Sequence, residues 1–200
     1  MFITEYTPGW INVDNKLNAL DSLAKAGDFL KDVNQDKGNW KWFVIALHHA
    51  LYTLMLLALE NTDGSGVRVR DERDDNGYII TANPDTGVPV PLITFLTAYE
   101  RLKDSGRMRG YTDSAPFVAT EVNDKAMRRI NFGLRNKFMH MEPTGWGIEV
   151  NYIVFCCLDL EEVIKFFSET SQILWVEDQK EQLIHAQQRI IQRLIELATQ

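Results

Sequence analysis

Three side chains close to residue 140 are of the types that act on phosphate groups. Arg135 and Asn136 are adjacent, and His140 follows four residues later, in the pattern R-N-x-x-x-H. A histidine with an unperturbed pKa of about 6.5 can take up and release protons near neutral pH. An arginine guanidinium binds phosphate oxygens through a fork of N–H groups, and an asparagine amide can hold either partner. The segment therefore combines groups for proton transfer with a group for charge stabilisation.

These side chains belong to an expected helix over residues 124–141, for which Asn123 is a suitable N-cap and Pro143 an end signal. An α-helix turns by about 100° per residue, so its apolar residues predict a core-facing stripe. On the opposite side, three polar residues spaced seven and four apart should lie along one line. The stripe comprises Met127, Ile130, Leu134, Phe138 and Met141, and the line comprises Arg129, Asn136 and His140.

Two apolar residues, Phe132 and Met139, lie beside this polar line, which Arg128 and Arg135 flank. A solvent-facing helix surface rarely groups such residues, so we expect this face to be covered by another element or by a second copy of the chain. An element or a second copy packed over this line of Arg, Asn and His would form a small polar cleft. The alternative is a partly buried helix whose arginines pair with Asp or Glu side chains.

The R-N-x-x-x-H pattern, late in a mostly helical chain, resembles the signature of the HEPN superfamily, an R-x4-6-H motif on a late helix of a helical bundle. Asn136 matches the polar residue that commonly follows the arginine, and the resemblance extends loosely over residues 40–174. It implies an all-α, HEPN-like bundle that acts as a metal-independent RNA endonuclease of the toxin or defence type. The RNA substrate would be a tRNA or an mRNA, and an antitoxin is a candidate partner.

By this resemblance, Arg135, Asn136 and His140 form a catalytic site, and the RNA is cleaved by its own 2′-hydroxyl. His140 would move protons, while Arg135 would stabilise the phosphorane. These two side chains are about 140° apart around one α-helix, so Arg135 of one copy would approach His140 of the other in a homodimer. The expected substrate-binding residues are Arg128, Arg129 and Lys137.

Two other interpretations stay open. A catalytically silent HEPN-like module could bind RNA or nucleotides or act as a scaffold, and a helical interaction protein could carry the motif by chance. The net charge of −7 disfavours long RNA and so mildly favours the silent module. However, residues 101–137 carry a net charge of +5 and the rest of the chain carries −12, so the middle of the chain can still attract phosphate. A merely solvated helix face would carry the same charges.

The rest of the sequence predicts one helical domain over residues 1–200. Hydrophobic residues make up 45% and charged residues 24%, which is the balance of a folded soluble chain. Glycines and prolines mark an irregular insertion over residues 61–91, in which alternating segments at 67–70 and 78–81 flank Asn76-Gly77 and favour a β-hairpin. Helical periodicity covers residues 13–33, 40–60, 92–103, 152–174 and 177–198.

Cysteine usage and the N-terminus favour a reducing, cytoplasmic setting. Cys156 and Cys157 are adjacent, and neighbours in sequence rarely meet disulfide geometry. Residues 1–10 lack the charged and apolar regions of a signal peptide. Residues 40–59 are long and apolar, but polar residues interrupt their middle, so they predict a central buried helix and no membrane partner.

No metal and no cofactor is expected. His48 and His49 point about 100° apart on a helix, which favours one core histidine with satisfied hydrogen bonds and one at the helix edge. The adjacent cysteines lack the C-x-x-C spacing of a zinc site. Tryptophans are expected in the core or in an interface rather than as stacking platforms for bases; these are Trp40, Trp42 and Trp146.

Overall fold

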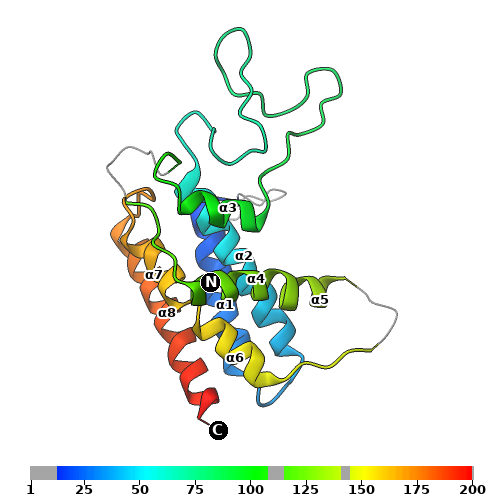
Figure 1. Cartoon of the computed structure of the whole chain (residues 1–200). Helices are drawn as coiled ribbons and strands as arrows, with labels where there is room; N and C mark the ends of the chain where they lie inside the picture. The colour runs from blue at the N-terminus through cyan, green and yellow to red at the C-terminus, as the bar shows by residue number, and fades with distance from the viewer. Residues whose placement is uncertain (1–12, 108–114, 141–144, 200) are drawn as a thin grey trace, which may run out of the picture.

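The structure of the protein is a computed structural model that describes residues 13–107, 115–140 and 145–199. Helices make up most of these ranges, which contain isolated β-bridges but no β-sheet, so the predicted all-α class is confirmed (Figure 1). The expectation for residues 1–10 lies outside the described residues. The elements are α1 (Asn15–Lys31), α2 (Asn39–Leu59), α3 (Phe95–Leu102), α4 (Glu121–Arg128), the π-helix η1 (Arg129–Arg135), α5 (Asn136–Met139), α6 (Val150–Leu158), α7 (Glu161–Glu169) and α8 (Glu177–Ala198).

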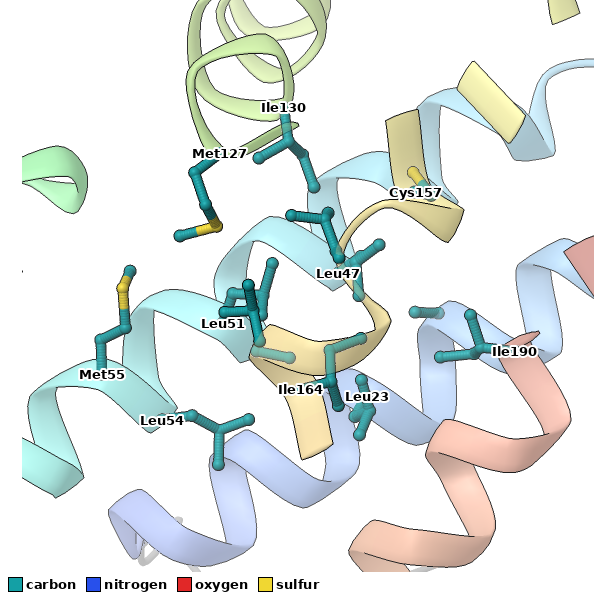
Figure 2. Packing of buried hydrophobic residues seen from close by; sticks show 14 of the residues in the cluster. Leu23, Leu47, Leu51, Leu54, Met55, Met127, Ile130, Cys157, Ile164 and Ile190 are labelled. Carbon is teal, nitrogen blue, oxygen red and sulfur yellow. The ribbon is translucent and has the colours of Figure 1, made fainter. Parts of the chain in front are cut away.

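Helix α2 lies at the centre of the bundle. Helix α1 packs along it, and α3, η1 and α7 also contact it, while α8 contacts α1, α6 and α7. Figure 2 shows Leu47 and Leu51 of α2 among fully buried residues from three other helices, namely Leu23, Ile164 and Ile190. Because neighbours cover α2 on several sides, its sequence is apolar nearly all round instead of carrying one apolar stripe.

Within the described ranges, α2 is the one helix that is long and apolar enough to cross a membrane. Length and composition alone are weak evidence for a span, because the core helix of a bundle passes the same test. Most of α2 is buried against the rest of the chain. The prediction of a central buried helix over residues 40–59 agrees with this packing.

The single helix expected over residues 152–174 is wrong, because the chain forms two helices, α6 and α7, that meet at Asp159-Leu160. The N–H of Leu160 donates to the carbonyl of Cys157 at 3.2 Å, a bond of the tighter type that often ends a helix. Nδ2 of Asn123 donates to the carbonyl of Asp159 at 3.1 Å. The turn between α6 and α7 is thereby tied to the first turn of α4.

The insertion between α2 and α3 leaves the bundle as two projecting loops (Figure 1). Its ends are paired, because the N–H of Ile93 donates to the carbonyl of Val67 at 3.0 Å and the N–H of Val69 donates to the carbonyl of Pro91 at 3.1 Å. The Arg101 guanidinium on α3 also donates to the carbonyl of Gly66 at 2.6 Å. The insertion is therefore anchored to the bundle by a short two-stranded stem.

The turn expected at Asn76-Gly77 is confirmed, but the hairpin pairs other residues than expected. Residues 67–70 pair with the end of the insertion, whereas Arg73 bridges Ile79. The Asp74 carboxylate accepts hydrogen bonds from the N–H groups of Asn76 and Tyr78, both at 2.9 Å. This closes a tight turn in which Gly77 takes a positive φ of 84°, and the Arg73–Ile79 bridge follows directly outside it.

Candidate active site

The helix that carries the R-N-x-x-x-H segment starts three residues earlier than expected. Thr120, not Asn123, is the N-cap of α4, and the side chains of both residues form a reciprocal capping box. Tyr99 Oη of the neighbouring helix α3 and Nζ of its C-cap Lys103 donate to Oδ1 of Asp124 at 2.9 and 3.1 Å. Burial chiefly raises the pKa of Tyr99, which therefore stays protonated and can donate this hydrogen bond. These contacts fix the start of α4.

The expectation of a continuous α-helix over residues 124–141 is wrong, because the middle of this segment is a π-helix. The chain passes from α4 into η1 (Arg129–Arg135) and then into the short helix α5. Hydrogen bonds from residue i to i+5 put more residues in each turn than an α-helix has. Each added residue rotates the following side chains by about 100° relative to a regular α-helix. The side chains after η1 therefore point in other directions around the helix axis than regular α-helical spacing predicts.

The predicted line of Arg129, Asn136 and His140 is changed by this rotation. Arg129 lies over the ring of Tyr152 at 5.7 Å, and Lys137 lies over the ring of Trp146 at 5.8 Å. Lys137 thus faces the segment that leads into α6, which runs back below α5 in Figure 1, and Arg129 faces the first turn of α6. Arg129 shares its side of the helix with Lys137, and regular α-helical spacing had placed it with Asn136 and His140.

The predicted core stripe is present through most of its length. Met127, Ile130 and Leu134 are fully buried. Phe138 is half-buried, with its ring centroid 5.1 Å from that of Trp146. Met141 lies outside the described residues.

His48 of α2 is the buried neighbour of the π-helix. Its Nε2 lies 3.0 Å from Oδ1 of Asn131, and its ring stacks on Phe95 at 4.1 Å. Burial chiefly lowers the pKa of His48 to about 4; the hydrogen bond to Asn131 opposes this, and the positive charge of Arg135 adds to it. His48 is therefore neutral at pH 7, and the guanidinium of Arg135 lies within electrostatic reach of it.

The interpretation of His48 and His49 as a satisfied core histidine and an edge histidine is confirmed. His49 is exposed, and its Nε2 lies 3.1 Å from Nδ2 of Asn18 on α1. The two histidines thus bind different partners. No group of three or more His, Cys, Asp or Glu side chains in the described residues is placed to hold a metal ion.

Arg135 and Asn136 contact each other directly. Nη1 of the half-buried Arg135 donates to Oδ1 of Asn136 at 3.0 Å, which orients the guanidinium and the amide together. Among the described residues, no carboxylate lies within ion-pair distance of Arg128, Arg129 or Arg135. The alternative in which these arginines are held by Asp or Glu partners therefore finds no support in this part of the chain.

His140 is exposed at the end of α5. Its backbone N–H donates to the carbonyl of Asn136 at 2.9 Å, and its backbone is extended, with φ −98° and ψ 124°. No hydrogen bond joins it to Arg135 within the described residues. In one copy of the chain, the structure therefore brings Arg135 to Asn136 but does not bring Arg135 to His140.

The apolar residues beside the motif are open to solvent in the single chain. Phe132 is 57% exposed and Met139 is 49% exposed. Arg128 and Lys137 are also exposed, so the surface mixes cationic and apolar groups. Within the described residues no other element covers Phe132 and Met139, so cover by a second copy stays a prediction. The sequence did not point to Asn131 or Tyr152, and a glycine in the middle of a helix was the available signal for a close contact at Gly133.

Comparisons of the chain with known protein families, with curated proteins and with solved structures found no match.

Proposed function

We propose that the chain is a metal-independent RNA endonuclease of HEPN type, with a composite active site formed by Arg135, Asn136 and His140 across a homodimer. The observation that carries this proposal is the Arg135–Asn136 hydrogen bond, which orients a guanidinium without a carboxylate partner in the described residues. The exposed His140 is the C-cap of α5, the short helix that begins at Asn136. A cation with no anionic partner is available for phosphate.

The proposed reaction is an internal transfer within the RNA. The 2′-oxygen attacks the adjacent phosphorus, the bond from phosphorus to the 5′-oxygen breaks, and a 2′,3′-cyclic phosphate and a 5′-hydroxyl result. One His140 takes the proton from the 2′-hydroxyl, and the His140 of the other copy gives a proton to the leaving 5′-oxygen. Arg135 stabilises the negative charge of the phosphorane, and Asn136 holds the guanidinium. Nothing in these steps requires a metal ion.

The dimer is proposed because Arg135 and His140 do not meet in one copy. A two-fold axis beside α5 would bring Arg135 of one copy to His140 of the other and would cover the exposed Phe132 and Met139. Arg128, Arg129 and Lys137 belong to α4, η1 and α5 in that order, and beside this axis they would contact RNA.

The test is cleavage of tRNA and total cellular RNA in EDTA by the purified chain and by the His140→Ala and Arg135→Ala variants. We expect cutting by the wild type with 2′,3′-cyclic phosphate ends, and at least a hundredfold loss in each variant. His185→Ala, an exposed histidine on α8, and Arg70→Ala, an exposed arginine of the insertion, are the matched controls. Cutting that persists in His140→Ala would show that the active site lies elsewhere.

The acidic body of the chain supports one alternative, a silent HEPN-like module that binds RNA or nucleotides without cleaving them. The same assay separates the two functions. A folded dimer that binds RNA and leaves it intact would establish the binding module, whereas a folded monomer without activity would contradict both.

A further inference from the structure

A cavity of about 280 Å³ opens between the π-helix and the segment that leads into α6. It lies beside the R-N-x-x-x-H segment, because Lys137 belongs to both. The volume is at the lower end of the range for small-molecule sites, which suits a single planar ring system. The residues of its lining on which the argument rests are Gly133, Lys137, Trp146, Glu149 and Tyr152.

Two aromatic side chains, Trp146 and Tyr152, belong to the lining. Trp146 is 36% exposed and Tyr152 is 38% exposed, so both present ring surface to the cavity and to solvent. Phe138 packs against Trp146 with 5.1 Å between ring centroids and supports it from the bundle side. Exposed aromatic rings beside cations are the usual platform on which proteins stack unpaired bases. This use of Trp146 differs from the core or interface role expected from the sequence.

Gly133 gives the cavity its width. A Cβ at this position would lie 3.0 Å from Oη of Tyr152, which is tighter than most Cβ contacts in proteins. A side chain here would therefore require the Tyr152 hydroxyl to shift. The absence of a side chain therefore lets Tyr152 lie against the π-helix and leaves the space beside it open.

The cavity is lined by two side chains of opposite charge, Glu149 and Lys137. Glu149 offers only acceptors, and Lys137 offers only donors. Among the described residues, neither has an oppositely charged partner within ion-pair distance, and the Glu149 side chain makes no capping bond to α6. Both groups are therefore available to a ligand.

We infer that this cavity binds an unpaired guanine base of RNA, an inference that rests on the proposed function for the choice of RNA as the ligand. On its Watson–Crick edge, guanine carries two adjacent N–H donor groups and one carbonyl acceptor. A carboxylate accepts both donors, and an ammonium group donates to the carbonyl. Adenine, cytosine and uracil offer no such pair of adjacent donors. Glu149 would therefore select guanine, while Trp146 and Tyr152 would stack on it and Lys137 would contact its carbonyl.

The experiment measures binding of single-stranded RNA by fluorescence anisotropy, using the full chain with His140→Ala in EDTA so that the RNA stays intact. The probes are eight-nucleotide uridine strands that carry one central guanosine, adenosine or cytidine, together with the all-uridine strand. We expect the guanosine strand to bind about tenfold more tightly than the others, as hydrogen bonds to a charged group allow. Equal affinity for all four strands would overturn the inference.

Two variants locate the effect. Glu149→Ala should abolish the preference for guanosine and keep the weaker binding to all strands, and Glu177→Ala, at the start of α8, is its control. Trp146→Ala should weaken binding of the guanosine strand by about fivefold or more, and the exposed Trp42→Ala is its control. Circular dichroism and thermal unfolding check that each variant is folded. A guanosine preference that survives Glu149→Ala would overturn the assigned selectivity.

Failure of this inference and failure of the proposed function give different results. Cleavage in EDTA without a preference for guanosine would leave the endonuclease standing and remove the guanine site. A preference for guanosine without any cleavage by the wild type would remove the endonuclease and leave a guanine-binding protein.

Discussion

Nε2 of His48 on α2 lies 3.0 Å from Oδ1 of Asn131, in the middle of the π-helix. This bond joins two helices, and the two bonded residues are 83 positions apart in the sequence. It fixes the wide helical turn at its buried side, next to Arg135, whose charge acts on the pKa of His48. The His48–Asn131 bond therefore connects the buried core to the π-helix that carries Arg135.

Removal of Asn131 should destabilise the fold. In Asn131→Ala the buried ring nitrogen of His48 loses its partner, which costs about 1–3 kcal/mol for an unsatisfied buried polar group. The measurement is urea unfolding at pH 7, with Asn151→Ala on the exposed side of α6 as the control. An unfolding free energy equal to that of the wild type would show that the bond contributes nothing.

The stability of the protein should fall as the pH falls from about 6.5 towards 4. Burial chiefly lowers the pKa of His48 from 6.5 to about 4, so between these values the unfolded chain binds a proton that the folded chain does not. Unfolding is then favoured increasingly, by up to about 3 kcal/mol at about 1.4 kcal/mol per pKa unit. Below about pH 4 this contribution becomes constant.

The check is urea unfolding between pH 4 and pH 7.5 for the wild type and for His48→Gln, which cannot titrate. The wild type should lose more stability than the variant over this window. Parallel pH profiles would contradict the shifted pKa.

Gly133 and Tyr152 should be energetically coupled. Alanine normally stabilises a helix interior by up to about 1 kcal/mol relative to glycine. At Gly133 this gain should be lost, because the added Cβ would lie 3.0 Å from Oη of Tyr152. Tyr152→Phe removes the oxygen, so Gly133→Ala should stabilise the phenylalanine background more than it stabilises the wild type. A double-mutant cycle by thermal unfolding measures the difference, and additive effects would exclude the contact.

Introduction of a charge at Phe132 should separate the proposed dimer. Phe132 is 57% exposed in the single chain, so Phe132→Glu costs little within one copy but would bury a carboxylate in the interface. We expect a dimer for the wild type and a folded monomer for the variant in light scattering after size exclusion. Val118→Glu, at an 85% exposed position, is the control. A dimer that withstands Phe132→Glu would place the interface elsewhere.

The sequence predicted those elements well whose spacing is regular. The helix over residues 177–198 has the predicted ends, since its buried stripe of Leu183, Ile190 and Leu194 follows α-helical spacing throughout. The burial of Met127, Ile130 and Leu134 was equally accessible.

The remaining features depend on contacts between distant residues. Within the π-helix, Asn131 is bonded to His48 and Gly133 lies close to Tyr152, and local spacing reveals neither contact. Because the prediction used 100° per residue throughout, it grouped Arg129 with Asn136 and His140, whereas Arg129 lies over the ring of Tyr152. An asparagine amide suits an N-cap, but Oδ1 of Asn123 accepts from the N–H of the N-cap Thr120, and its Nδ2 donates to the carbonyl of Asp159.

The paired stem of the insertion makes the segment beyond it exchangeable. Since Val67 and Val69 are already bonded to Ile93 and Pro91, the chain enters and leaves the projecting loops at nearly the same place. The stem sets the distance between α2 and α3. A longer loop beyond the stem therefore adds mainly the entropic cost of loop closure, and this cost grows slowly with loop length. Another peptide grafted in place of residues 70–90 would therefore project from the bundle on this stem, and the helices would keep their positions.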